Sequence, residues 1–207
     1  MNIDKFNYKL PKELIAQYPP KNRGDSKLLS TNPSSQTLKD LYFKDFVKLI
    51  EPNDLIVFNN TKVIKARLFG NKETGGKIEI LIEQVLDNQK ALAMIKSSKK
   101  INMRLKVLFS NNYIVEILER KENFFLISLN KGSFDELMKL NGHIPLPPYI
   151  KRPQEADDNN RYQTIFAKRD GAIAAPTAGM HFSKSDFKLF DEKNINYTFL
   201  TLHVGSG

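Results

Sequence analysis

The stretch from Ala174 to Phe182, which reads AAPTAGMHF, gathers side chains that could do chemistry. Its small residues let a ligand approach the backbone closely, and Gly179 permits a positive φ that other residues resist. Thr177 adds a hydroxyl, and His181 adds an imidazole that titrates near neutral pH. A tight turn that packs His181 into the core explains the same residues equally well. The motif is therefore a hypothesis about a ligand site.

The residue types available restrict the chemistry further. The chain has no cysteine, which excludes disulfides and thiolate ligands. The histidines, His143, His181 and His203, are not spaced as zinc ligands are. Neither a Walker loop nor a dinucleotide-binding GxGxxG motif occurs. We therefore expect neither a metal nor a permanently bound cofactor.

Two further groups of polar residues are candidates for ligand contacts. Arg23 and its polar neighbours surround Gly24 in the loop KNRGDSKLL, which could bind an anion or a ribose but also suits a surface turn. Asn59, Asn60 and Thr61 directly follow the apolar run LIVF. Polar side chains at the end of a buried strand are costly unless paired, so these residues either cap the next turn or face a ligand.

Positive charge is concentrated in one part of the chain. The net charge is +9, and no acidic residue lies between Asp87 and Glu116. A basic patch suits a polyanion because each neutralised phosphate releases counterions, whereas a solvated lysine-rich surface is the alternative. The residues that we expect to form an RNA-binding patch are Lys96, Lys99, Lys100, Arg104 and Lys106.

The basic residues fall within a region that has the pattern of a small β-structure. Short β-rich runs separated by polar turns predict an antiparallel barrel or sandwich. The six predicted strands cover residues 63–69, 77–83, 91–95, 105–109, 113–118 and 124–129.

Helices and strands alternate on both sides of that region. Apolar periodicity predicts helices at residues 11–18, 40–50 and 183–194, and a capping-box pattern opens another at Ser133. A buried strand is predicted at residues 55–58, a short apolar strand at residues 172–175 and a further strand at residues 195–204. The proline-rich residues 143–150 predict a stiff extended linker that returns the chain from the β-rich region.

Size and hydropathy place the chain among globular proteins. Its 207 residues, 41% of them hydrophobic, suit one large domain or two modest ones. The N-terminus carries acidic residues and lacks the apolar run of a signal peptide. No stretch approaches the ~18 apolar residues of a transmembrane helix. We therefore expect a cytoplasmic protein without membrane contact.

Seven blocks of sequence, taken together, resemble a known family. In chain order they are LPKELIAQYP, DLIVFNNTKVIKARLFG, ETGGKIEIL, GHIPLPPYIKR, RYQTIFA, GAIAAPTAGMHF and TLHVGSG. In this order they resemble the S-adenosylmethionine:tRNA ribosyltransferase-isomerases of queuosine biosynthesis along essentially the whole chain. The resemblance implies a mixed α/β (α+β) sandwich-like domain, residues 1–61 and 144–207, with an inserted six-stranded antiparallel β-barrel, residues 62–143.

The resemblance also implies a reaction and its partners. The family transfers and isomerises the ribosyl part of S-adenosylmethionine onto 7-aminomethyl-7-deazaguanine at the tRNA wobble position. The products are epoxyqueuosine, adenine and methionine. The expected partners are therefore the anticodon region of tRNA and S-adenosylmethionine as a co-substrate.

The reaction requires a general base, because the sulfonium acidifies the protons on the ribose 5′-carbon. His181 and His203 both lie in matching blocks; we favour His181, and the other role for each is a hydrogen bond to substrate or backbone. Arginines could pair with phosphates or the methionyl carboxylate, tyrosines could stack on a base, and the amides after residue 58 could read base or ribose edges. The positions expected at the substrate are Arg23, Asn59, Asn60, Thr61, Arg67, Tyr149, Arg152, Arg161, Tyr162, Gln163, Thr164, Pro176, Thr177, Ala178, Gly179 and Gly205.

Members of the family extend beyond the HVGSG block, so the resemblance implies that a C-terminal part is absent from this chain. A complementing C-terminal polypeptide is accordingly an expected partner. Three alternatives stay open: an active tRNA-modifying transferase, a tRNA-binding module without catalysis, and an inactive fragment.

Overall fold

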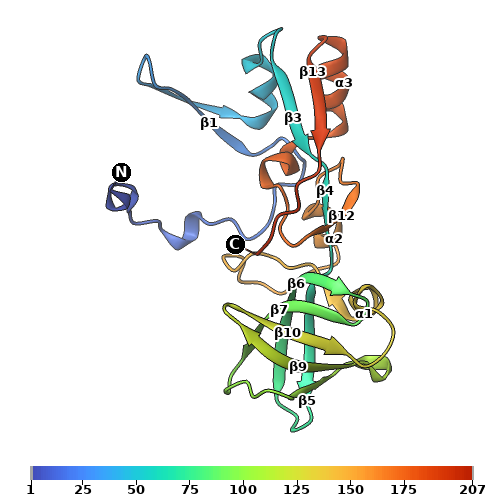
Figure 1. The fold of residues 1–207 in the computed structure, drawn as a ribbon. Coiled ribbons are helices and arrows are strands. Elements are labelled where there is room, and N and C mark those ends of the chain that lie inside the picture. The colour runs from blue at the N-terminus through green and yellow to red at the C-terminus, as the bar shows by residue number, and fades with distance from the viewer. Residues whose placement is uncertain (1, 207) are drawn as a thin grey trace.

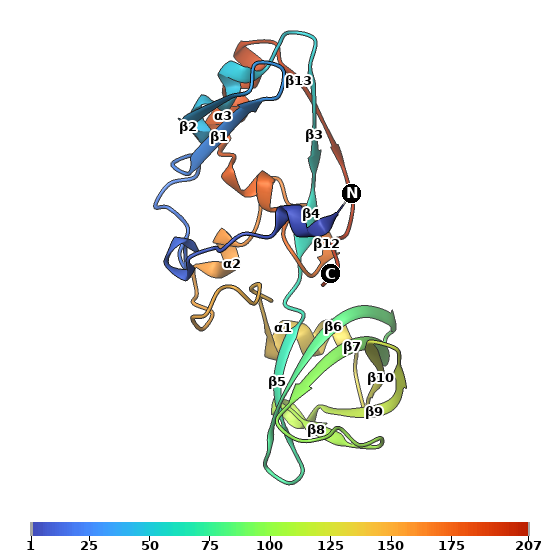
Figure 2. The same ribbon diagram turned by 90° about the vertical axis from the view of Figure 1, so that its left-hand side faces the viewer.

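A closed barrel of six antiparallel strands occupies the middle of the chain in the computed structural model, which describes residues 2–206 (Figures 1 and 2). Neighbouring strands follow the order β5-β6-β7-β10-β9-β8, and β8 pairs with β5 to close the barrel. This confirms the predicted fold class. The barrel strands are β5 (Arg67–Lys72), β6 (Lys77–Asp87), β7 (Lys90–Ser97), β8 (Lys106–Leu108), β9 (Ile114–Lys121) and β10 (Phe124–Leu129).

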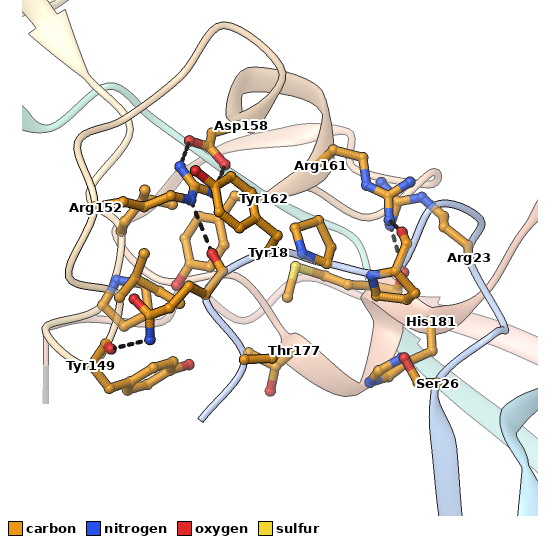
Figure 3. Close-up of a pocket in the computed structure, with 18 residues that line it drawn as sticks. Tyr18, Arg23, Ser26, Tyr149, Arg152, Asp158, Arg161, Tyr162, Thr177 and His181 are labelled. Atoms are coloured by element: carbon orange, nitrogen blue, oxygen red, sulfur yellow. Dashed lines mark hydrogen bonds and ion pairs between the residues drawn. The ribbon is translucent and has the colours of Figure 1, made fainter. Parts of the chain in front are cut away.

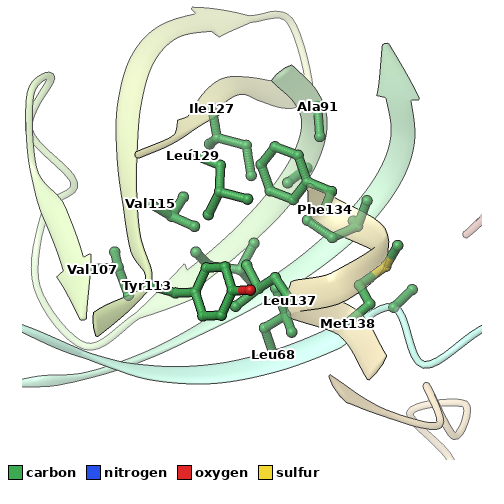
Figure 4. Packing of buried hydrophobic residues seen from close by; sticks show 14 of the residues in the cluster. Leu68, Ala91, Val107, Tyr113, Val115, Ile127, Leu129, Phe134, Leu137 and Met138 are labelled. Carbon is green, nitrogen blue, oxygen red and sulfur yellow. The ribbon is translucent and has the colours of Figure 1, made fainter. Parts of the chain in front are cut away.

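The barrel has the largest apolar core of the molecule. Ile78, Ile80 and Ile82 alternate inward along β6, as the period of two in a strand requires. Helix α1 (Phe134–Asn141) begins at Ser133 with the predicted capping box and places Phe134 and the next apolar turn against the barrel interior (Figure 4). The short turn η4 (Ser110–Asn112) and strand β11 (Gly142–His143), which pairs with β5, complete this part.

The rest of the chain forms an α/β part built from three two-stranded pairs. β3 (Leu55–Asn59) pairs in parallel with β13 (Asn196–Leu200), and β4 (Thr61–Val63) pairs in parallel with β12 (Arg169–Ala172). β1 (Lys27–Asn32) and β2 (Thr37–Tyr42) form an antiparallel hairpin. The helical segments are η1 (Ile3–Phe6), η2 (Lys12–Leu14), η3 (Phe43–Leu49), α2 (Asp158–Arg161), η5 (Thr177–His181) and α3 (Lys184–Glu192).

Aromatic rings fill the core between β3, η3 and α3. Phe58 and Phe190 are buried there, with Phe182 between them and with Phe166 and Phe187 packed alongside. Helix α3 is capped at Ser183 by Asp186, as the sequence pattern predicts.

Five sequence-based expectations are wrong in detail, and the fifth concerns the strand predicted at residues 195–204. The predicted helix at 40–50 is the end of β2 followed by the 3₁₀ helix η3, because Tyr42 is extended and caps that helix together with Asp45. The predicted helix at 11–18 is the single turn η2, and the predicted strand at 172–175 lies earlier, at β12. The predicted buried strand at 55–58 is only half-buried, since Leu55 and Val57 are 59% and 52% exposed where β3 has β13 as its partner.

The predicted strand at 195–204 ends at Leu200, and the reason is an amide side chain. Asn59 Nδ2 donates to the carbonyl oxygen of Leu202 at 2.8 Å, and the Leu202 amide donates back to Asn59 Oδ1 at 3.0 Å. The side chain thus takes the place of a strand partner and redirects the chain. This is the capping role that the sequence left open for this polar residue.

No helix within residues 2–206 is long and apolar enough to cross a membrane.

Candidate active site

A cavity of 340 Å³ lies where the N-terminal segment, the proline-rich linker, α2 and η5 meet (Figure 3). Gln17 links the N-terminal segment to the proline-rich linker. Its Nε2 donates to the Tyr149 carbonyl at 3.1 Å, and its Oε1 accepts from the Lys151 amide at 2.6 Å. Tyr149 and Tyr162 lie toward one end of the cavity, and the other end carries guanidinium groups and an imidazole. Its volume is that of a small-molecule site.

One wall of the cavity is a buried ion pair. The guanidinium of Arg152 makes two bonds of 2.7 Å to the carboxylate of Asp158, and the two side chains are only 12% and 6% exposed. The pair lowers the pKa of Asp158, chiefly through the hydrogen bonds from Arg152. Arg152 also lies 4.4 Å from the Tyr18 ring centroid and donates to the Gln17 carbonyl. The guanidinium group of Arg152 is therefore occupied by contacts within the protein.

Two more guanidinium groups converge at the opposite end of the cavity. Arg23 donates to the carbonyl oxygens of Met180, Gln163 and Asn160 at 2.6, 2.7 and 3.0 Å. Arg161 donates to those of Pro20 and Lys21 at 2.6 and 3.1 Å. Burial lowers the pKa of Arg23, and the nearby charge of Arg161 lowers it further. Like charges held together in this way favour an anion at this end of the cavity.

His181 stands at the same end, as the last residue of η5. Its ring stacks on Phe43 with the centroids 5.0 Å apart. Burial lowers the pKa of His181, and the charge of Arg23 lowers it further. Both effects favour the neutral imidazole near pH 7, which is the form that accepts a proton.

The rest of the AAPTAGMHF stretch shapes the turn that carries His181. Pro176 precedes η5, Thr177 lines the cavity and Ala178 is exposed. Gly179 is buried where a Cβ would lie 2.9 Å from Thr164 Cγ2. The glycine is required here by close packing. Thr164 is buried, and its hydroxyl has no hydrogen-bond partner among residues 2–206.

His203 lies in a different groove, so the structure does not bring the two candidate bases together. Its Nδ1 is 2.8 Å from the hydroxyl of buried Thr61. Its ring packs on Gly171, where a Cβ would be 2.7 Å from the imidazole. Gly205 lines the same groove, along with the carboxylate residues Glu83, Asp135 and Asp170.

The remaining predicted substrate residues bind other parts of the chain. Asn60 accepts a hydrogen bond from Thr201 Oγ1 at 2.6 Å. The side-chain amide of Gln163 bonds to both the amide and the carbonyl of Val63, at 3.0 and 2.7 Å, and fixes β4. Arg67 pairs with Glu79 at 3.0 Å and donates to the Leu146 carbonyl at 3.1 Å. These contacts tie the segments around the cavity to one another.

The basic residues lie on the barrel, outside the cavity. Lys96 is on β7, Lys99 and Lys100 follow that strand, and Lys106 is on β8. Arg104 is 3.2 Å from Glu116, which also pairs with Lys106 in the strand register. Folding therefore brings an acidic residue into a patch that is free of acids in the sequence.

Sequence reasoning missed several residues of the cavity, notably Tyr18, Gln17 and Asp158. Tyr18 is the last residue of the helix predicted at residues 11–18, but it directly precedes Pro19-Pro20, and the chain there is extended and exposes its ring. Asp158 lies in the acidic run EADDNN and has no distinguishing local signal. Its partner, Arg152, was predicted at the substrate.

Comparison with known proteins gives three similarities. A family model described as "Queuosine biosynthesis protein" matches residues 3–207. A curated protein of Nitrosococcus oceani, described as S-adenosylmethionine:tRNA ribosyltransferase-isomerase, is 47% identical over 208 residues, covering 100% of this chain and 60% of that protein. The chain thus spans less than two thirds of that relative. A crystal structure of S-adenosylmethionine tRNA ribosyltransferase from Thermotoga maritima matches with a TM-score of 0.40 and 24% identity, over 97% of this chain and 58% of the other.

Proposed function

This chain belongs to the queuosine biosynthesis protein family, and from that membership we propose that it acts in the transfer and isomerisation of the ribosyl moiety of S-adenosylmethionine. The acceptor is 7-aminomethyl-7-deazaguanine at the tRNA wobble position, and the products are epoxyqueuosine, adenine and methionine. The reaction would take place in the cytoplasm. The observation that carries the proposal is a cavity with tyrosines at one end and an imidazole beside two guanidinium groups at the other.

The two ends of the cavity suit the two ends of S-adenosylmethionine. Tyr149 and Tyr162 offer ring faces to the adenine, and burial raises the pKa of the Tyr162 hydroxyl so that it stays a neutral phenol. Arg161 and Arg23 offer positive charge to the methionyl carboxylate. The sulfonium and the ribose would then lie between these ends, within reach of Thr177 and His181.

His181 is the residue that we propose as the general base. The sulfonium acidifies the ribose 5′-protons, and a neutral imidazole accepts one of them. Adenine then leaves, the aminomethyl nitrogen of the RNA base attacks the ribosyl group, and methionine leaves when the bond between the ribosyl carbon and the sulfonium sulfur breaks. The lowered pKa of His181 keeps the acceptor form populated at neutral pH.

Release of adenine from S-adenosylmethionine, in the presence of tRNA bearing 7-aminomethyl-7-deazaguanine, tests this proposal. The chain is assayed alone and fused to the part of the Nitrosococcus oceani relative that it does not span. We expect the fusion to release adenine and the chain alone to be almost silent. The reason is that Leu200 and Leu202, close to His203 in the chain, are 45% and 64% exposed and so have little to pack against in the chain alone.

Two matched histidine variants of the fusion separate the candidate bases. We expect His181→Gln to lower turnover by about 10²–10⁴-fold, with tRNA binding retained. His203→Gln should have a much smaller effect, because His203 lies in another groove. The reverse order would transfer the role of base to His203. A fusion that binds tRNA but never releases adenine would favour the alternative of an RNA-binding module without catalysis.

A further inference from the structure

An exposed pair of aromatic rings lies on the outside of the barrel. Phe69 of β5 is 55% exposed, because residues alternate along the strand and its neighbours Leu68 and Gly70 point inward. His143, the second residue of β11, is also exposed, and its ring meets Phe69 edge-to-face with the centroids 5.1 Å apart. Single exposed apolar residues need no explanation, but two rings held together by paired strands form a fixed surface.

Positive charge and polar groups surround the Phe69–His143 pair. The groove beside Phe69 has a volume of 690 Å³ and is lined by Lys77 and Lys96 together with Asn71. Glu79 is the carboxylate of this groove, and its charge is matched by Arg67 at 3.0 Å. The two lysines therefore give the groove a net positive charge.

The groove continues toward the cavity of the proposed reaction. It shares Glu79 and Lys96 with a second groove, which runs between the barrel and the proline-rich linker. The second groove shares Leu146, Pro147 and Tyr162 with the cavity. The shared lining residues place the two grooves and the cavity next to one another along this side of the molecule.

We infer that the Phe69–His143 pair is a stacking site for an unpaired RNA base and that Lys77 and Lys96 contact the adjacent phosphates. The inference rests on the proposed function, since it supplies a place for nucleotides that flank the wobble nucleotide when that nucleotide reacts at the cavity. Aromatic faces in a positively charged groove are the means by which proteins hold single-stranded nucleic acid without reading its sequence. This site shares Lys96 with the predicted patch of Lys96, Lys99, Lys100, Arg104 and Lys106, and it differs from that patch because it adds stacking to charge.

Fluorescence anisotropy with a labelled RNA hairpin, which has a single-stranded loop, tests the inference on the full chain. A fully paired duplex of the same length is the second probe. Phe69→Ala should weaken hairpin binding by about 5- to 100-fold, the usual worth of one stacked base. Phe69→Tyr, which keeps the ring, should bind like the wild type. Duplex binding should change little in either variant.

Leu86→Ala is the matched control. Leu86 is 47% exposed on β6 of the same barrel but lines neither groove, so this change should leave hairpin binding unaltered.

The salt dependence of hairpin binding separates the contribution of stacking from that of charge. Phe69→Ala should keep the wild-type slope of log K against log salt. Lys77→Ala and Lys96→Ala should each reduce its magnitude by about 1.

The outcomes distinguish failure of the inference from failure of the proposed function. A Phe69→Ala variant that binds the hairpin as tightly as the wild type overturns the stacking site and leaves the proposed function standing. Equal weakening by Leu86→Ala also overturns it, because the effect would not belong to this face. A wild-type chain that binds no hairpin overturns the inference and counts against tRNA as substrate.

Discussion

Removing one partner of the Arg152–Asp158 ion pair should strongly destabilise the part of the molecule that holds the cavity. Asp158→Asn keeps the size of the side chain but leaves the guanidinium of Arg152, 12% exposed, without a counter-charge. Arg152→Met leaves the carboxylate of Asp158, 6% exposed, in the same position. Each change breaks two bonds of 2.7 Å in a site with little access to water.

The expected magnitude follows from this burial. Breaking a buried ion pair costs about 3–5 kcal/mol, whereas an exposed pair is worth about 0–1 kcal/mol. A loss of about 4 kcal/mol is a large part of the 5–15 kcal/mol that is typical of a whole domain. At a urea m-value of about 2 kcal/mol/M, it lowers the unfolding midpoint by about 2 M.

Urea unfolding followed by circular dichroism measures this loss, and hydrogen exchange of residues 152–162 localises it. The double variant Arg152→Met/Asp158→Asn completes the cycle and should cost several kcal/mol less than the sum of the single changes, because it leaves no unpaired charge. Single variants that each cost less than about 1 kcal/mol, or strictly additive effects, would refute the assignment of a buried, coupled pair.

Four further predictions follow from the described contacts. The pKa of Asp158 is lower in the folded state, so the contribution of its ionised form to folding stability is present above the unfolded pKa of about 3.9 and is lost as pH falls through the folded pKa. The difference in urea midpoint between wild type and Asp158→Asn should therefore shrink on acidification below that range. Phe58→Ala should cost about 3–5 kcal/mol in urea unfolding, because the ring is 5% exposed among aromatic side chains, and Phe199→Ala, at a site 41% exposed, should cost clearly less. Replacing Lys96, Lys99, Lys100 and Arg104 with Ala should flatten the salt dependence of tRNA binding, and an unchanged slope would remove that patch from the interface. Limited trypsin digestion should cut the exposed N-terminal segment and the β1–β2 hairpin before the barrel, residues 67–129; early loss of the barrel would contradict its status as the best-packed part.

The barrel could be predicted from the sequence because its signals are local. Each strand alternates inward and outward residues over a few positions and is bounded by polar turns, so the pattern of β6 is recognisable without knowledge of its partners. The capping boxes at Ser133 and Ser183 are local as well, and both helices begin where predicted. The apolar periodicity at residues 40–50 was misleading, because a mostly exposed strand followed by a 3₁₀ helix brings Phe43, Phe46 and Val47 to the core without an α-helix, while Leu49 stays exposed.

The site was only partly predictable because its contacts are long-range. Arg23 was proposed at the substrate from its charge, and it does line the cavity, but its guanidinium also binds carbonyl oxygens more than 130 positions away in the chain. The same holds for Gln17, whose partners Tyr149 and Lys151 lie across the linker. No pattern of neighbouring residues encodes such pairs. Sequence reasoning could therefore propose His181 and its turn, but not the walls around it.

The most direct test of the central claim is hydrogen–deuterium exchange of the 207-residue chain with and without excess S-adenosylmethionine. If the ligand occupies the cavity, peptides that cover residues 14–26, 146–163 and 174–182 should exchange more slowly in its presence, because all three segments line the cavity. The barrel peptide at residues 114–121 should be unchanged. Protection confined to residues 168–172 and 201–206, around His203, or no protection anywhere, would contradict the assignment of this cavity to S-adenosylmethionine.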